Sequence, residues 1–293
     1  MKLYSVNCGH FKLDGGAMFG VVPKSMWNKL NPADENNMCS WALRSLLIEE
    51  GDRLVLIDNG MGDKQDAKFF GHYYLHGDDT LDRSLAKHGF HRNDITDVIL
   101  THLHFDHCGG SIVREGDRLV PAFPNARFWS NERHWKWATE PNAREKASFL
   151  KENILPIQES GQLHFVEEQT MLNPDAPLPL HPSGILPSIQ FYFAQGHTDA
   201  MMIPVIRYGE RTVVFMADLL PSAAHIPLPY VMAYDMFPLT TLHEKKYFLE
   251  TAARENYILF YQHDPLNECG LLQSTEKGIR SADLFTLASY VGS

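Results

Sequence analysis

The chain has 293 residues, of which 44% are hydrophobic, so it is long enough to bury a large core. Its 26 Lys and Arg against 36 Asp and Glu give a net charge of −10, which argues against nucleic acid or an anionic membrane surface as the main partner. No apolar stretch could cross a bilayer, the N-terminus lacks a signal-peptide core and the four cysteines show no CxxC spacing, so we expect a cytoplasmic protein with free thiols.

The first sixty residues have a β-rich pattern. A strand is expected at 3–6, and a hairpin of 39–49 with 53–57 turns at Glu50-Gly51-Asp52. Between these strands, residues 18–27 are apolar and interrupted by Gly and Pro. They form either a loop packed on the core or the flexible wall of an apolar substrate pocket, for which Met26 and Trp27 are suited.

Asp58 stands at the end of the second hairpin strand and is followed by Asn59-Gly60. A carboxylate there could orient a ligand histidine through its other ring nitrogen, or could simply cap the next turn. Further along, residues 80–88 have helical spacing and stop at Gly89.

A cluster of metal-type side chains follows the apolar run 97–100, which predicts a buried strand. His102 and His104 are two residues apart, so an extended backbone points both to one side. Asp106 and His107 come next, where the chain turns toward Gly109-Gly110. Imidazole and carboxylate ligands suit zinc and similar divalent ions, and four such side chains in six positions are hard to explain as packing.

The middle of the chain is less regular. Residues 126–129 predict a short strand, and a helix that follows carries His134, which we expect to be exposed. A second helix is expected at 142–158. Residues 171–187 are rich in proline and polar side chains, so they are expected to cross the surface as a loop and not to separate two domains.

Three further strand ends carry a metal-type residue. The predicted strands are 189–193, 202–208, 211–216 and 257–261, and a helix is predicted at 241–256. His197, Asp218 and His263 each follow one of these strands. Open α/β sheets bind their ligands at the ends of strands, so these residues join the candidate metal site.

This pattern resembles the metallo-β-lactamase superfamily, whose signature is an HxHxDH loop followed by a His, an Asp and a final His at strand ends. All seven positions are present in order: His102, His104, Asp106, His107, His197, Asp218 and His263. The resemblance spans most of the chain. It implies an α/β fold, an αββα four-layer sandwich of two mixed sheets with helices outside, formed as a single domain over residues 1–293.

The resemblance also implies two divalent metal ions, for which zinc is predicted, although manganese, iron or cobalt would also fit. One ion would be held by His102, His104 and His197, the other by Asp106, His107 and His263, with Asp218 bridging them. A hydroxide between the metals would attack the substrate. Asp106 could then pass a proton to the leaving group, so Asp106 and Asp218 are the predicted catalytic residues.

Other branches of the superfamily fit less well. Dizinc β-lactamases carry a cysteine in place of Asp218, and Cys108 is not at a ligand position, so we expect a buried spectator thiol. Flavodiiron oxidoreductases differ in the motif and add a flavin domain. RNA-processing members usually carry extra nucleic-acid-binding segments, and glyoxalase II would need a basic cluster that is not evident near the C-terminus.

The closest likeness is to quorum-quenching N-acyl homoserine lactone lactonases, carried by the N-terminal apolar loop and by residues 217–225 and 231–240. Their substrate is a small molecule with an apolar tail. Some of them place a tyrosine three residues after the bridging Asp, where this chain has Pro221. The missing hydrogen-bond donor could come from His225, Tyr230 or Tyr234, each of which could equally be a packing residue.

Several alternatives stay open at this point. The same dimetal chemistry fits a phosphotriesterase or arylesterase, or a glyoxalase II-like thioesterase. A metal-stabilised binding module is the non-enzymatic alternative, but structural zinc sites are normally closed by four ligands and need no bridging acid. Related enzymes often form homodimers, and the sequence leaves the oligomeric state open.

Overall fold

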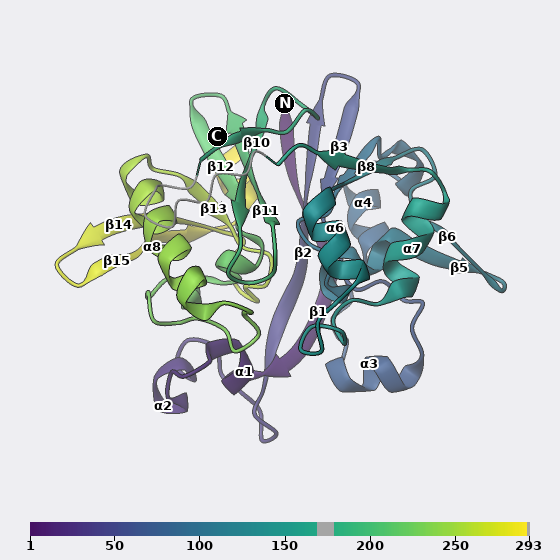
Figure 1. The fold of residues 1–293 in the computed structure, drawn as a ribbon. Coiled ribbons are helices and arrows are strands. Elements are labelled where there is room, and N and C mark those ends of the chain that lie inside the picture. The colour runs from purple at the N-terminus through teal and green to yellow at the C-terminus, as the bar shows by residue number, and fades with distance from the viewer. Residues whose placement is uncertain (169–178, 292–293) are drawn as a thin grey trace. The chain divides into compact units, whose positions relative to one another are not determined.

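The computed structural model of the chain describes residues 1–168 and 179–291, which divide into two compact units (Figure 1). Unit 1 comprises Met1–Phe11 and Ala42–Glu167, and unit 2 comprises Lys12–Trp41 and the chain from Glu168 onward. Both units combine a mixed β-sheet with helices, which confirms the predicted α/β fold class. That residues 1–293 form a single domain stays a prediction.

The sheet of unit 1 has six strands in the order β1-β2-β3-β4-β7-β8. Their bounds are Lys2–Asp14, Met38–Glu50, Arg53–Ile57, Asp97–Ile99, Arg127–Asn131 and Leu163–Val166. Strands β2 and β3 form the predicted antiparallel hairpin, whereas β3, β4, β7 and β8 are parallel neighbours. Because parallel strands end at one edge of a sheet, the loops after β3, β4 and β7 leave the sheet side by side.

The other elements of unit 1 agree only in part with expectation. The helices are α3 (Ala67–Tyr73), α4 (Leu81–Lys87), α5 (Phe105–Cys108), α6 (Glu132–Thr139) and α7 (Lys151–Glu159), and β5 (Ile112–Glu115) pairs with β6 (Arg118–Pro121). The prediction of α4 is confirmed, with Thr80 as its N-cap. The predicted helix 142–158 is wrong in its first half, because the side chain of Asn142 accepts the backbone N–H groups of Arg144 and Glu145 and forms a turn.

The sheet of unit 2 has seven strands in the order β15-β14-β13-β12-β11-β10-β9. From β9 to β15 the bounds are His181–Pro182, Ile189–Ala194, Met201–Tyr208, Arg211–Phe215, Ile258–Phe260, Cys269–Thr275 and Gly278–Phe285. Only β12 and β13 pair in parallel, and β10 runs in their direction because it is separated from β12 by the antiparallel β11. The carboxyl ends of β10, β12 and β13 therefore lie at the same end of this sheet.

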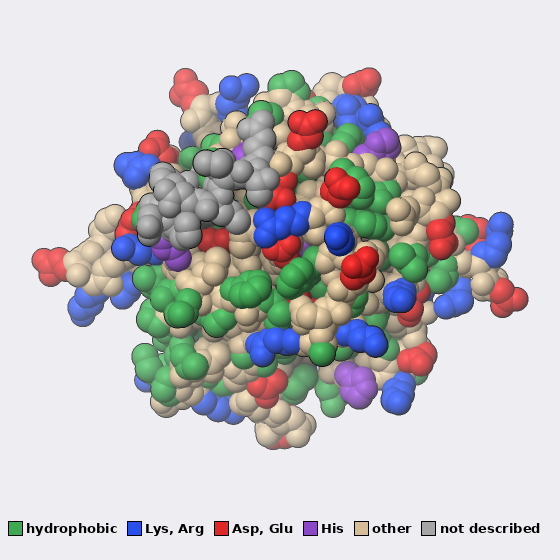
Figure 2. Space-filling view, in the orientation of Figure 1, with side chains coloured by type: hydrophobic (Ala, Val, Ile, Leu, Met, Phe, Trp, Pro, Cys, Tyr) green, Lys and Arg blue, Asp and Glu red, His purple; other side chains and the backbone are tan. Residues whose placement is uncertain are grey.

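The helices of unit 2 are α1 (Gly15–Phe19), α2 (Lys24–Trp27), α8 (Pro238–Arg254) and α9 (Leu287–Val291). The apolar segment 18–27 thus contains short helical turns. Strand β9 lies within the predicted surface loop 171–187, of which residues 171–178 are outside the described residues. On the face drawn in Figure 2, acidic and basic side chains are interspersed, and hydrophobic side chains gather over α8.

No helix within the two described ranges has both the length and the hydrophobicity needed to cross a bilayer. The cytoplasmic location stays a prediction, as does the homodimer.

Candidate functional site

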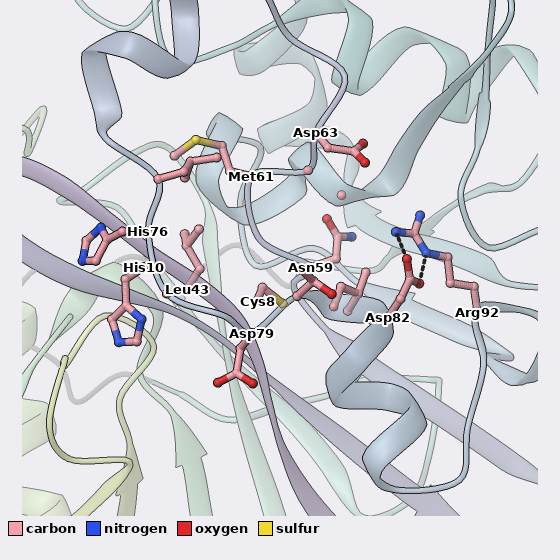
Figure 3. A pocket seen from close by; sticks show the side chains of 17 residues that line it. Cys8, His10, Leu43, Asn59, Met61, Asp63, His76, Asp79, Asp82 and Arg92 are labelled. Carbon is pink, nitrogen blue, oxygen red and sulfur yellow. Dashed lines mark hydrogen bonds and ion pairs between the residues drawn. The ribbon is translucent and has the colours of Figure 1, made fainter. Parts of the chain in front are cut away.

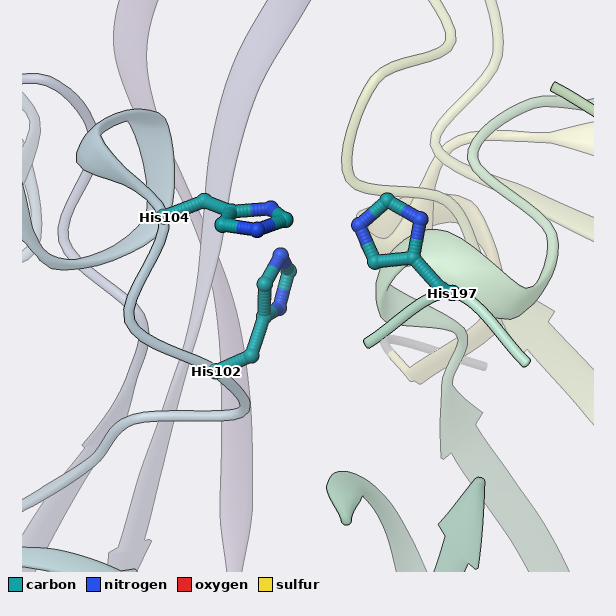
Figure 4. A group of neighbouring side chains, drawn as sticks. All are labelled: His102, His104 and His197. Atoms are coloured by element: carbon teal, nitrogen blue, oxygen red, sulfur yellow. The ribbon is translucent and has the colours of Figure 1, made fainter. Parts of the chain in front are cut away.

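The loop after β4 brings together the four ligands predicted in unit 1. His102, His104, Asp106 and His107 are all buried, and the last two lie in the short helix α5. The ring of His102 lies 3.8 Å from that of His107 and 4.5 Å from that of His104, measured between centroids. Figure 4 shows the rings of His102 and His104 close together and nearly perpendicular. Packing this many polar rings together is costly unless their ring nitrogens have partners.

Asp58 supplies partners for two of these rings from the loop after β3. Its fully buried carboxylate accepts both the backbone N–H and the hydroxyl of Thr101, each at 2.8 Å. Nδ1 of His107 donates to the same carboxylate at 3.0 Å, and Nδ1 of His102 donates to the Thr101 hydroxyl at 3.1 Å. One carboxylate thus fixes Nδ1 as the protonated nitrogen of both histidines and leaves their Nε2 atoms to act as ligands.

The glycines after the motif are required by close packing. A Cβ atom at Gly109 would overlap the carbonyl of Met61, and one at Gly110 would overlap the carbonyl of Asn59. Cys108, just before them, is buried, and its thiol donates to the carbonyl of Leu103. Burial raises the pKa of this thiol, so the placement agrees with the expected spectator role.

The expectation that His134 is exposed is wrong. The ring is fully buried, and its Nε2 accepts the backbone N–H of Leu103 at 2.9 Å, midway between two predicted ligands. This N–H needs an acceptor because it lies in a buried loop outside the sheet. Asn131 at the end of β7 caps α6 by accepting the backbone N–H of His134. Because β7 is the parallel neighbour of β4, this cap holds His134 beside the loop that follows β4.

The three ligands predicted in unit 2 also come together. His197 follows β10, Asp218 lies just after β12, and His263 follows β13; His197 is drawn in Figure 4. One carboxylate oxygen of Asp218 lies 3.1 Å from Nε2 of His197, and the other lies 3.2 Å from Nε2 of His263. All three side chains are buried. A carboxylate shared between two imidazoles is the arrangement expected of a bridging metal ligand.

The electrostatics around His197 favour a cation. Its Nδ1 donates at 2.8 Å to the buried carboxylate of Asp235, a residue that the sequence did not single out. Burial alone would lower the pKa of the His197 imidazole, but Asp218 and Asp235 raise it to about 10. The same negative charges would favour a metal ion at Nε2.

The donor chemistry therefore fits divalent metal ions. Among residues 1–168 and 179–291, every group of three His, Cys, Asp or Glu side chains able to hold a metal ion draws only on the seven predicted ligands. Five imidazoles with two carboxylates suit zinc and similar divalent ions, and two further carboxylates, Asp58 and Asp235, orient ligand rings.

Helix α8 holds the loops of unit 2 in place. Buried Glu244 accepts the backbone N–H groups of Gln195, at 2.7 Å, and of Gly196, at 3.1 Å, just before His197. The next residue, Lys245, is also buried and donates to the carbonyls of Pro227, Leu228 and Tyr230. These two side chains fix the paths of the segments that carry His197 and Tyr230.

We expect Glu244→Gln to lower the free energy of unfolding by about 1–3 kcal/mol, because an amide N–H₂ would face one of two buried backbone donors. The measurement is chemical denaturation of the purified variant. Glu250→Gln, on the exposed side of the same helix, is the matched control and should leave the stability nearly unchanged. Equal stability of both variants would contradict this role for Glu244.

The candidate substrate residues occupy two kinds of position. Trp27 and His225 are buried, and both stack on the ring of Phe19, at centroid distances of 5.2 and 4.7 Å. Nδ1 of His225 pairs with the Ser222 hydroxyl, Nε2 donates to a backbone carbonyl, and burial lowers the pKa of the ring to about 3. These placements agree with the packing alternative.

The remaining candidates reach the surface of unit 2. Met26 is 53% exposed and Tyr234 is 39% exposed, whereas Tyr230 is half-buried and meets the Phe19 ring edge-on. The segment 18–27, which carries Met26, adjoins the segment that carries Tyr234, since a Cβ atom at Gly20 would overlap the carbonyl of Val231. An apolar tail could be bound where these segments adjoin.

A separate cavity of about 340 Å³ lies within unit 1 (Figure 3). Its lining includes His10, His76, Asp79 and the ion pair of Asp82 with Arg92, in which Nη2 and Oδ2 are 3.0 Å apart. Asn59, next to Asp58, also lines it. The mixture of charged walls does not suit an acyl chain, so the cavity is not a candidate for tail binding.

Comparison with known proteins gives one family match. The family described as the metallo-beta-lactamase superfamily matches residues 44–263. A curated relative, the N-acyl homoserine lactonase of Bacillus cereus, is 22% identical over 92% of this chain and 95% of its own length.

Solved structures of metal-dependent hydrolases are also similar to this chain. A probable metal-dependent hydrolase from Staphylococcus aureus is 26% identical, with a TM-score of 0.84 over 97% of this chain and 96% of that one. AidC, a dizinc quorum-quenching lactonase in complex with its product N-hexanoyl-L-homoserine, is 22% identical, with a TM-score of 0.72 over 95% and 92% of the two chains. The second likeness shows the fold alone.

Proposed function

Because this chain belongs to the metallo-beta-lactamase superfamily, we propose that it is a dimetal hydrolase that opens the lactone ring of N-acyl homoserine lactones. Membership confirms the predicted class, a metal-dependent hydrolase. The choice of substrate is supported by distant similarity, over nine tenths of the chain, to curated lactonases. The biological role that follows from this substrate is quorum quenching.

We place the two metal ions on the seven predicted ligands, with zinc as the metal. The first ion would be held by His102, His104 and His197, and the second by Asp106, His107 and His263, with Asp218 shared. In this proposal residues 1–293 act as a single domain. The observation that carries this proposal is the position of Asp218 between two histidines, where dizinc β-lactamases have a cysteine.

When bound, the two ions would activate a water molecule as nucleophile and polarise the lactone carbonyl. The chain's own residues prepare that chemistry. Asp58 and Asp235 hold ligand rings in one tautomer. In this proposal Asp106 would take up a proton and deliver it to the ring oxygen as the lactone opens. The exposed apolar side chains near Met26 and Tyr234 would receive the acyl tail.

Two related activities compete with this proposal. Pro221 stands where some lactonases place a tyrosine that binds the substrate carbonyl, which favours a phosphotriesterase or arylesterase as the second candidate. A glyoxalase II-like thioesterase would use the same centre on a different ester.

The test is hydrolysis of homoserine lactones with short to long acyl chains, followed by pH-stat and compared with a phosphotriester, an aryl ester and a thioester. The proposal expects the lactones to give the highest kcat/KM. Preference for the phosphotriester or thioester would overturn the substrate assignment and leave the hydrolase class in place.

Met26→Ala should lower kcat/KM for long-chain lactones by about tenfold and for short-chain lactones much less, because an exposed methionine contributes roughly 1–2 kcal/mol when a tail buries it. The measurement is kcat/KM across the acyl series. Leu284→Ala, at a partly exposed position in β15, is the control and should change neither value. Equal losses of kcat/KM at all chain lengths would show that Met26 has only a packing role.

A further inference from the structure

Glu145 lies against a predicted metal ligand, although no local sequence pattern singles it out. Its carboxylate is 3% exposed, and Oε1 lies 3.3 Å from Nε2 of His104. Glu145 belongs to the turn that replaces the first half of the predicted helix 142–158. This turn is tied to the metal loop by the backbone N–H of Phe105, which donates to the carbonyl of Ser148 at 3.0 Å.

The other carboxylate oxygen is held by two donors. Oε2 of Glu145 accepts Nε1–H of Trp137 at 2.7 Å and the side-chain amide of Asn142 at 2.8 Å. Neither donor can be reversed, because an indole N–H only donates and the carbonyl oxygen of Asn142 is occupied by backbone N–H groups. Oε1 is therefore kept as an acceptor directed at His104.

We propose that Glu145 is a positioning residue that keeps the proton of His104 on Nε2, so that Nδ1 is the nitrogen available to a metal ion. His102, His107 and His197 have the opposite arrangement, since their Nδ1 atoms donate to the oxygens of Thr101, Asp58 and Asp235, respectively. His104 is thus held through its other nitrogen. This inference rests on the proposed metal site, but it does not depend on which substrate is hydrolysed.

Glu145→Gln tests the role because the donors at Oε2 dictate the orientation of the new amide. Its oxygen must face Trp137 and Asn142, so its N–H₂ group must face Nε2 of His104. Two donors would then oppose each other unless the ring moved its proton to Nδ1, the atom that should bind metal.

We expect Glu145→Gln to weaken the binding of one zinc ion by about 10–100-fold, measured by competition with a chromogenic chelator on the zinc-loaded enzyme. Glu140→Gln, at an exposed position nearby, is the control and should stay close to the wild-type affinity. Unchanged zinc affinity in folded Glu145→Gln would overturn the proposal.

A second measurement needs no variant. Nitrogen-15 NMR of the zinc-loaded wild-type protein should find His104 protonated at Nε2, and protonation at Nδ1 would overturn the proposal even if Glu145→Gln failed to fold. Neither readout uses a substrate. Absence of lactone hydrolysis alongside the expected zinc affinities and tautomer would therefore reject the proposed function and retain the role of Glu145.

Discussion

Asp218→Ala is expected to reduce the bound metal from two ions to about one and to lower kcat by more than the roughly 10–100-fold typical of losing an outer hydrogen-bond partner of a ligand. The carboxylate oxygens of Asp218 lie 3.1 Å from His197 and 3.2 Å from His263. Alanine would leave two buried imidazoles without the anion between them. The measurement is metal content by mass spectrometry, with kcat on the same sample.

The matched control for this variant is Asp283→Ala, an exposed acid in β15 of the same unit. It removes the same charge and should retain both ions and full turnover. A full complement of two ions in Asp218→Ala would rule out the bridging role.

Asp58→Asn should weaken metal binding by about 10–100-fold, because the substitution disturbs two ligand histidines at once. The carboxylate accepts three hydrogen bonds, from the Thr101 N–H, the Thr101 hydroxyl and His107 Nδ1. An asparagine side chain must direct its N–H₂ group at one or more of these donors. Competition with a chromogenic chelator measures this loss of metal affinity directly.

Thr101→Val separates the two branches of this network. It removes the hydroxyl that accepts the His102 proton but leaves the direct bond between Asp58 and His107. Its effect on metal affinity should therefore be smaller than that of Asp58→Asn. If Asp58→Asn bound both ions as tightly as the wild type, the carboxylate would only cap its turn, the alternative that the sequence left open.

The ligand positions were predictable because they follow from local pattern and sheet geometry. The apolar runs before His102, His197 and His263 form strands as predicted. In each unit the strands that precede these residues have a parallel neighbour, β3 beside β4 and β12 beside β13, and parallel strands end at the same edge of the sheet. Asp58 was found by the same reasoning, since β3 runs parallel to β4. The assignment of these residues as metal ligands stays a prediction.

The supporting residues could not be found in this way. His134, Glu145, Asp235 and Glu244 act on residues 31 to 49 positions away in the chain, through contacts that no local pattern encodes. Asn131 is a residue type that commonly caps helices, so the sequence could place His134 in the first turn of a helix. The same pattern carries no information on whether the His134 ring is buried. Only the tertiary fold supplies these partners.

Some elements were missed for a related reason. The hairpin of β14 and β15 is only partly buried, and its strands mix polar and apolar residues without regular alternation. The same is true of β5 and β6. Such strands are stabilised by their neighbours in the sheet more than by their own hydrophobic pattern.

The most direct test of a dimetal lactonase is stepwise zinc titration of metal-free protein, with hydrolysis of N-hexanoyl homoserine lactone measured at each step. If both ligand groups form one catalytic centre, turnover should stay low through the first equivalent of zinc and rise to its maximum with the second. Full turnover with one equivalent would contradict the bridged centre. Two tightly bound ions with no turnover would contradict the lactonase.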